Sequence, residues 1–524
     1  MLAITLLLFV LPAGEQTDYY TIETIPTPEG VVMEAGAARL IPAGEGRPQR
    51  LAVSTRRGEV WMLSDPLGDA AAGAHSKPQW TRFAHGLHEV LGLAWKDGWL
   101  YVTQRPDVSR VRDEDGDGRA DIYEVVADGW GISGDYHEYA FSTDFLPPES
   151  DYAGEIWVSL CLTGSFGSKV PFRGWAVRVT PDGRTVPVVS GVRSPGGMDF
   201  NAAGDVFYSD NQGPWNGTCG IKHLRPGAFV GHPGGFRWYE DTDAAGERPE
   251  EPKSESRIIV EADRIPKLEP AAVLLPYDRM GKSTSGILFD RTQPTLGNAS
   301  KFGPWTMPDG GPQAYVADQA HSTVMRMTLE RVQGHYQGAC YPMLEGFESG
   351  NLALEQAADG TLFVGGTNRG WGSRGKQPFA WERVRWTGKT PPAINFVSAT
   401  PDGFDVQYTL PVGESSIDRA AYDLEAFTYI YQEAYGSPEV DAWTPEITRV
   451  ERLDGRTVRL HFARLERGFV YKIAASGVRG DGGDPGDGSD RGDGGSDGGD
   501  RGDGGVPLWQ PIAYYTMNYV PERE

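Results

Sequence analysis

The feature that most constrains the fold is a recurring pair of short apolar runs separated by a glycine or aspartate turn. The pattern extends from Glu29 to Arg385, with clear instances in QRLAVSTRRGEVWML, GLAWKDGWLYVTQ, GMDFNAAGDVFYSD and LALEQAADGTLFVGGT. Apolar residues tend to alternate within each run, which is the period of a strand that buries one face. About six such units at roughly 50–70-residue spacing predict an all-β fold, a six-bladed β-propeller with long loops. A β-sandwich, the alternative, would need fewer and more even strands.

A second all-β unit is predicted after the Pro391-Pro392 linker. Alternation resumes in FDVQY and RTVRLHF, and the chain closes on PLWQPIAYYTMNYVP. These runs are typical of a small immunoglobulin- or fibronectin-like β-sandwich. We therefore expect a propeller over residues 15–388 and a β-sandwich over residues 390–524.

One segment of the second unit is predicted to be disordered. Residues 479–505 read RGDGGDPGDGSDRGDGGSDGGDRGDGG and offer no apolar side chain to a core. Such a segment cannot repay the entropy of ordering. We interpret it as a disordered Asp/Gly-rich loop without a specific role.

Charge and the N-terminal residues restrict the setting in which the protein works. The formal net charge of -23 argues against nucleic-acid binding, which needs a basic face.

The apolar run from Leu2 to Leu11 is too short to span a bilayer. It resembles the hydrophobic part of a secretion signal without the basic n-region, so we predict a truncated signal peptide over residues 1–14. An apolar strand is the alternative. We expect a secreted or periplasmic protein with no transmembrane span in the mature chain.

The cysteines exclude several classes of site. The chain has three, Cys161, Cys219 and Cys340, which can form at most one disulfide and no disulfide scaffold. No C-x-x-C-H is present, so a covalently attached c-type haem is excluded. No cysteine or histidine pair has the spacing of zinc ligands.

A twelve-residue acidic stretch, DEDGDGRADIYE, predicts a calcium-binding loop. It meets the sequence conditions of an EF-hand-type loop, with Gly118 at the sharp turn. The predicted ligands are Asp113, Asp115, Asp117, Arg119 through its carbonyl, Asp121 and Glu124. The flanking residues read as strands, so we expect a structural Ca²⁺ site grafted between propeller strands. A solvated acidic turn is the alternative.

Three separate stretches indicate a site at the propeller mouth. They are SGDYHEYAFSTDF with His137, GVRSPGGMDF with Arg193, and SDNQGPWNGTC with Gln212, Gly213 and Pro214. Corresponding ends of successive blades converge on one mouth, so these residues could meet despite their separation in sequence. Equally, His137 could be a hydrogen-bonded structural residue and Arg193 could pin a loop.

At these residues the chain resembles the soluble quinoprotein glucose and sorbosone dehydrogenases. Those are six-bladed propellers that use pyrroloquinoline quinone (PQQ) and Ca²⁺. The family's catalytic histidine corresponds to His137, its Arg-x-Pro-x-Gly stretch to the segment that begins at Arg193, and its Gln-Gly-Pro loop to Gln212. TPEGVVMEAG, VSRVRDEDGDGRAD, GTNRGWGSRGKQPF and AYYTMNYVP also resemble secreted or membrane-bound dehydrogenase propellers of planctomycete-type bacteria.

The resemblance implies that His137 takes the hydroxyl proton of a sugar or related alcohol and that Arg193 stabilises an oxyanion. It also implies that Gln212, with the carbonyls of Gly213 and Pro214, holds Ca²⁺ against the cofactor.

The family's cofactor-binding cations are absent at the corresponding positions. Ala320 or His321 replaces a lysine, and Gly350 and Leu352 replace an arginine pair. Arg369, Arg374 and Lys282 are candidates to substitute for them, and we assign Arg369 to cofactor binding.

The predicted function is quinoprotein-type oxidation of a sugar or alcohol, with an external electron acceptor. Trp215 and Trp371 are the predicted substrate-binding residues, because exposed rings stack on sugars. The alternative is a non-catalytic propeller that binds a carbohydrate or a partner and has lost the cofactor. A lactonase-like Ca²⁺ hydrolase is less well supported, because its central metal-ligand carboxylates are not recognisable.

Overall fold

The computed structural model confirms the all-β class. It describes residues 14–44, 48–68, 78–292, 299–307, 311–480 and 505–523. The predicted signal peptide, except Gly14, and most of the predicted disordered loop lie outside the described residues. No helix in the described ranges is both long enough and apolar enough to cross a membrane.

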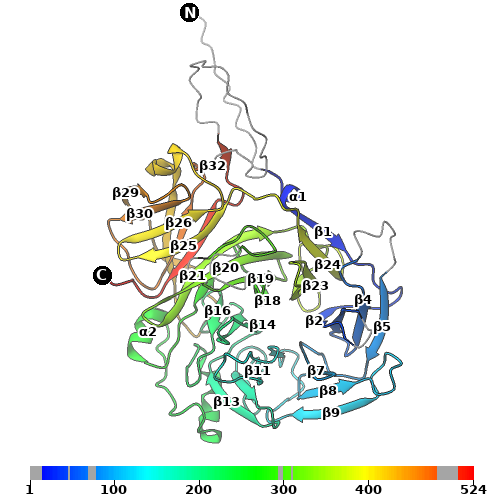
Figure 1. Cartoon of the computed structure of the whole chain (residues 1–524). Helices are drawn as coiled ribbons and strands as arrows, with labels where there is room; N and C mark the ends of the chain where they lie inside the picture. Colours follow the sequence, from blue (N-terminus) through cyan, green and yellow to red (C-terminus); the bar gives the residue numbers. More distant parts are fainter. Residues whose placement is uncertain are drawn as a thin grey trace, which may run out of the picture.

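Successive strands of the first four sheets pair in sequence order, each with its neighbour, antiparallel (Figure 1). The first sheet holds β2 (Ala35–Ile41), β3 (Arg50–Thr55), β4 (Val60–Ser64) and β5 (Gln79–Ala84). The second holds β6 (Gly92–Lys96), β7 (Trp99–Thr103), β8 (Val108–Arg112) and β9 (Ile122–Ala127). The third holds β10 (Ala140–Ser142), β11 (Ile156–Leu160), β12 (Trp175–Val179) and β13 (Thr185–Ser190). The fourth holds β14 (Pro195–Phe200), β15 (Val206–Asp210), β16 (Cys219–His223) and β17 (Val273–Leu275).

Two further sheets complete a ring. One begins with β18 (Thr284–Phe289), β19 (Gln313–Asp318), β20 (Thr323–Val332) and β21 (His335–Leu344). The other holds β22 (Asn351–Gln356), β23 (Leu362–Thr367), β24 (Phe379–Trp386) and, at its outer edge, the N-terminal strand β1 (Tyr20–Thr24). The innermost strands contact one another in turn, from β2 through β6, β10, β14, β18 and β22 back to β2. This closed arrangement is typical of a β-propeller.

Glycines allow the innermost strands to approach one another. A Cβ on Gly196 in β14 would lie 2.3 Å from the Thr284 carbonyl oxygen, and one on Gly286 in β18 would lie 2.4 Å from that of Leu352. Any larger residue would push neighbouring sheets apart at these positions. The glycines therefore set the narrow centre of the ring.

The C-terminal strands continue the sheet that begins with β18. Strand β21 pairs with β34 (Ile512–Met517), followed by β31 (Phe469–Ala474), β27 (Asp423–Tyr429) and β28 (Glu439–Trp443). A separate sheet holds β25 (Ile394–Thr400), β26 (Gly403–Tyr408), β30 (Thr457–Phe462) and β29 (Ile447–Arg452). The two sheets share an apolar cluster in which Phe404 contacts Tyr471 and Tyr515.

Short elements fill the connections. They are α1 (Gln16–Tyr19), α2 (Ile258–Arg264), the 3₁₀ helices over Pro233–Asp241, Glu414–Ile417 and Arg419–Ala421, and the strand pair β32 (Arg479–Gly480) and β33 (Val506–Pro507). All three cysteines are buried and free.

Candidate functional site

Loops at one end of the ring surround a cavity of about 430 Å³. The predicted site residues His137, Arg193, Gln212, Arg369 and Trp371 all line it. His137 precedes β10, Arg193 precedes β14, Gln212 follows β15, and Arg369 and Trp371 follow β23, so the convergence expected of a propeller mouth brings them together. None of the described lining residues is an aspartate or a glutamate.

The far side of the cavity is apolar. A second, smaller cavity of about 80 Å³ lies deeper in the ring, and Leu91, Phe141 and Leu352 line both. These side chains therefore lie between the two spaces. The larger cavity has an apolar floor.

His137 lies on the loop that leads into β10. Its backbone N–H donates to Asp135 Oδ1 at 2.9 Å, and its Nδ1 lies 3.8 Å from the same oxygen. Burial lowers the pKa of the imidazole below 6.5. The Asp135 carboxylate opposes this shift, whereas the charges of Arg193 and Arg105 add to it. The imidazole is therefore mainly neutral at pH 7 and can accept a proton.

The His137 loop is fixed by a buried carboxylate next to it. Glu138 accepts hydrogen bonds from the Ser133 backbone N–H at 2.6 Å, from the Ser133 hydroxyl at 2.8 Å and from the Thr163 hydroxyl at 2.8 Å. Glu138 is fully buried. Its role is to hold the loop, which leaves His137 half-buried at the cavity wall.

Arg193 leads into β14 and is 3 % exposed. Its Nε donates to the Ser165 carbonyl oxygen at 3.2 Å, and its Nη1 donates to the Gln212 carbonyl oxygen at 2.6 Å. The remaining acceptor is the Asn211 carbonyl, at 3.4 Å. None of these acceptors is a carboxylate. Arg193 therefore brings a fixed positive charge to the cavity without an acidic hydrogen-bond partner in the described ranges.

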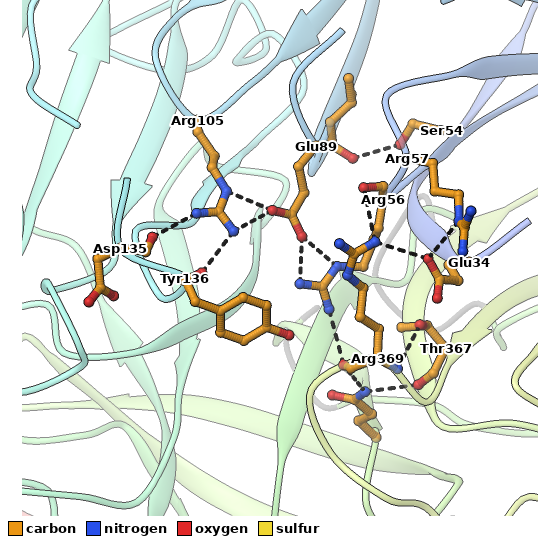
Figure 2. Close-up of polar contacts among 12 residues, drawn as sticks. Glu34, Ser54, Arg56, Arg57, Glu89, Arg105, Asp135, Tyr136, Thr367 and Arg369 are labelled. Atoms are coloured by element: carbon orange, nitrogen blue, oxygen red, sulfur yellow. Dashed lines mark hydrogen bonds and ion pairs between the residues drawn. The ribbon is translucent and has the colours of Figure 1, made fainter. Parts of the chain in front are cut away.

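Figure 2 shows two carboxylates shared among four arginines beside the cavity: Arg56, Arg57, Arg105 and Arg369. Glu89 accepts from Arg56 Nε at 2.7 Å and from Arg105 Nε at 2.6 Å. Glu34 lies 3.1 Å from Arg369 Nη1. Because guanidinium groups outnumber carboxylates in this network, this wall of the cavity favours an anionic group.

In the Gln-Gly-Pro loop, one of the carbonyl oxygens that the resemblance assigns to Ca²⁺ is engaged in backbone hydrogen bonds. The Gly213 carbonyl oxygen accepts from the backbone N–H of Asn216 at 3.0 Å and of Gly436 at 3.1 Å. The Arg193 guanidinium already donates a hydrogen bond to the Gln212 backbone carbonyl. The Gly213 oxygen is therefore already engaged, while Ca²⁺ needs several oxygen ligands. Gln212 faces the cavity, whereas Gly213 and Pro214 are not among its lining residues.

The two predicted substrate-binding tryptophans have different positions. Trp371 lines the cavity and is 59 % exposed. Trp215 lies outside the lining, which corrects its expected place. Its ring centroid is 5.0 Å from that of Tyr431, and its backbone N–H donates to the Gln432 carbonyl at 2.7 Å. Trp215 thus supports a C-terminal loop.

Two of the candidate replacement cations lie at the cavity. Lys282 and Arg369 line it, whereas Arg374 lines a different pocket. Lys282 Nζ lies 2.7 Å from Asp278 Oδ1.

Sequence reasoning missed further residues of the lining, among them Arg56, Tyr139 and Tyr435. Tyr139 follows His137 by two positions in the same stretch, and only the histidine carried a recognisable chemical signal. Arg56 and Tyr435 belong to no motif, so only the fold brings them to the cavity.

The predicted calcium loop joins β8 to β9. One carboxylate oxygen from each of Asp113, Asp115 and Asp117 lies within 4.8 Å of the others, and Gly118 turns with φ +91°. Asp121 Oδ2 instead accepts from the backbone N–H groups of Glu114 and Asp115.

Glu124 lies on β9 and does not join the three clustered aspartates. Its Oε2 accepts from Arg110 Nε at 2.7 Å. Asp121 is likewise engaged with the loop backbone, so the structure gathers three of the predicted carboxylates. The predicted carbonyl ligand, Arg119, donates its backbone N–H to Asp117 Oδ1.

One protein family matches part of the chain. Its description is "Domain of unknown function (DUF7133)", and the match covers residues 34–247. No curated protein matches the chain.

Three solved structures are similar to the chain at low sequence identity. A Thermus thermophilus protein described as an oxidoreductase (glucose dehydrogenase) is 17% identical, with 70% of this chain and 99% of that chain covered and a TM-score of 0.48. The PQQ-bound aldose sugar dehydrogenase of Streptomyces coelicolor is 15% identical, with 71% and 99% covered and a TM-score of 0.41. The PQQ domain of Coprinopsis cinerea pyranose dehydrogenase is 12% identical, with 70% and 95% covered and a TM-score of 0.44.

Proposed function

We propose that the protein is an oxidoreductase that oxidises a sugar or related alcohol in the large cavity. The supporting observation is that His137 and Arg193, from two different loops, line one cavity that has an apolar floor. The proposal includes a six-bladed propeller followed by a β-sandwich, a secreted or periplasmic location and an external electron acceptor. Kinship with the dehydrogenase propellers of planctomycete-type bacteria is part of the same hypothesis.

The side chains divide the chemistry between them. Neutral His137 accepts the proton of the substrate hydroxyl while the C–H bond of the substrate breaks. Arg193, held by carbonyl groups, keeps a positive charge where negative charge is bound or develops. The apolar floor formed by Leu91, Phe141 and Leu352 limits water from behind.

The cavity fits an anionic cofactor such as PQQ, which would supply the acceptor for the substrate's hydride. Arg193, Lys282 and Arg369 would hold its carboxylates, since each lines the cavity and the described lining has no carboxylate to repel them. The saturated Gly213 carbonyl does not support Ca²⁺ at the Gln-Gly-Pro loop. We separately propose Ca²⁺ at the Asp113–Asp117 loop, in a structural role, because three carboxylates gather there.

The test is dye reduction by the purified protein with PQQ and Ca²⁺ on a sugar panel, comparing the wild type with His137→Ala. We expect the substitution to lower kcat/KM by about 10²- to 10⁴-fold, the range of general base catalysis. The melting temperature should stay within about 2 °C, because the His137 side chain is half-buried at a loop surface. Retained turnover in the variant would refute the assigned base.

Exposed aromatic rings favour a second candidate, a non-catalytic carbohydrate-binding protein. Phe166, Trp371 and Tyr435 line the cavity and are 62 %, 59 % and 54 % exposed. Such rings stack on sugars without any chemistry. Saccharide binding by calorimetry, with no dye reduction under any cofactor condition, would favour this candidate.

A further inference from the structure

A loop from beyond the Pro391-Pro392 linker forms part of the cavity wall. The loop joins β27 to β28 and carries Tyr435, which lines the cavity opposite residues of the ring. The proposed site therefore includes a side chain from the C-terminal strands.

Backbone contacts hold this loop against residues 213–217. The Gly436 N–H donates to the Gly213 carbonyl at 3.1 Å, and the Ser437 N–H donates to that of Gly217 at 2.9 Å. In the other direction, the Trp215 N–H donates to the Gln432 carbonyl at 2.7 Å. The loop is thus fixed on both sides of Tyr435 and can present that side chain in a defined place.

The backbone conformation favours glycine at position 436. Gly436 has φ +67°, and a Cβ there would lie 2.7 Å from the Gln212 side-chain carbon Cδ. Another residue would be strained at this φ and would also displace the end of the Gln212 side chain. Gly436 is therefore a position at which the docking can be disturbed without removing the tyrosine.

Tyr435 itself is placed like a ligand-contacting ring. The Arg193 guanidinium carbon lies 5.3 Å from its ring centroid, and the Phe166 ring centroid lies 6.4 Å away. Yet 54 % of the residue stays exposed, although aromatic side chains that serve packing are normally buried.

We propose that Tyr435 is a ligand-positioning residue, a stacking wall for the saccharide, supplied to the cavity by the C-terminal strands. This inference rests on the proposed function, because it assumes a saccharide in the cavity. Arg193 holds the ring from one side, and the exposed part of the ring stacks on the sugar. The C-terminal strands thus contribute to substrate binding.

The test compares Tyr435→Ala and Tyr435→Phe with the wild type, using D-glucose, D-galactose, maltose and lactose as probes. Binding is followed by calorimetry and turnover by dye reduction. Loss of the ring should raise Kd and KM about fivefold with little change in kcat, while phenylalanine should stay within about twofold. Leu453→Ala is the control, because Leu453 is 43 % exposed between β29 and β30, outside the cavity lining.

Gly436→Val provides a second variant, which keeps the tyrosine and disturbs its docking. It should raise Kd and KM as Tyr435→Ala does. An unchanged Kd in Tyr435→Ala, or a loss in Tyr435→Phe as large as in Tyr435→Ala, would overturn the stacking role. A wild type that neither binds nor oxidises any probe would refute the proposed function and this inference with it. If the wild type turns over normally and Tyr435→Ala has the same Kd and KM, this inference alone is refuted.

Discussion

Burial and the neighbouring Asp135 carboxylate act in opposite directions on the pKa of the proposed base, His137. Burial lowers the pKa of His137, and the Asp135 carboxylate partly restores it. The acid limb of kcat/KM should therefore lie below pH 6.5, because activity falls as pH falls and the imidazole takes up a proton. Asp135→Asn removes the opposing charge, so the pKa of His137 falls further and the limb moves to lower pH.

This substitution leaves the local hydrogen bonds possible. Asp135 Oδ1 accepts from the His137 and Gly164 backbone N–H groups, and an asparagine oxygen can do the same. A pH–rate profile of the two proteins provides the measurement, with the exposed Asp151→Asn as a control that should not shift. A limb that moves to higher pH in Asp135→Asn would contradict the electrostatic account.

Single site residues were predictable where their order along the chain determines their position in the fold. His137 and Arg193 each precede an innermost strand, and the starts of such strands converge, so their meeting followed from order along the sequence. Trp215 and Tyr435 show the limit. Both are aromatic loop residues, yet Trp215 packs behind the loop and Tyr435 faces the cavity. That difference depends on which loop docks against residues 213–217, and no local pattern encodes it.

The β8–β9 loop is the element whose metal binding can be tested directly. Asp113, Asp115 and Asp117 cluster, so removal of Ca²⁺ by EGTA should lower the melting temperature. Ligand linkage contributes about 2.7 kcal/mol at a hundredfold excess over Kd. Asp117→Asn should abolish the EGTA effect. Glu124→Gln should keep it, because Glu124 is paired with Arg110. If EGTA leaves the melting temperature of the wild type unchanged, the loop is a solvated acidic turn without a bound metal.

Strand pairs were predictable, whereas distant strand partners were not. Alternation and a turn residue mark a hairpin such as β14–β15, because both halves lie in one short stretch. The pairing of β1 with β24, and of β34 with β21, joins segments from far apart in the chain. Edge strands expose the same backbone groups whatever their sequence, so the choice of partner follows from the closed ring.

On the scale of the whole molecule, strands from both sides of the predicted boundary at residues 388–390 belong to one continuous sheet. Strand β21 hydrogen-bonds to β34 through Gly338, Ala339 and Cys340. The ring and the C-terminal strands therefore share a hydrogen-bonded edge as well as the loop that carries Tyr435.

The N-terminal strand connects these parts, and Tyr20 lies where they meet. Tyr20 is 1 % exposed and pairs with Trp386, and its ring centroid lies 5.3 Å from Phe302 and 6.0 Å from Trp509. Tyr20→Ala should cost about 3–5 kcal/mol, because a buried ring is lost and a cavity remains. Tyr20→Phe keeps the ring and removes a buried hydroxyl that makes no hydrogen bond in the described residues, so it should change the stability by less than about 1 kcal/mol. Urea denaturation followed by tryptophan fluorescence measures both. A loss below about 1 kcal/mol in Tyr20→Ala would mean that β1 does not stabilise the closed ring. An unchanged m-value would show that the variant exposes the same surface on unfolding as the wild type.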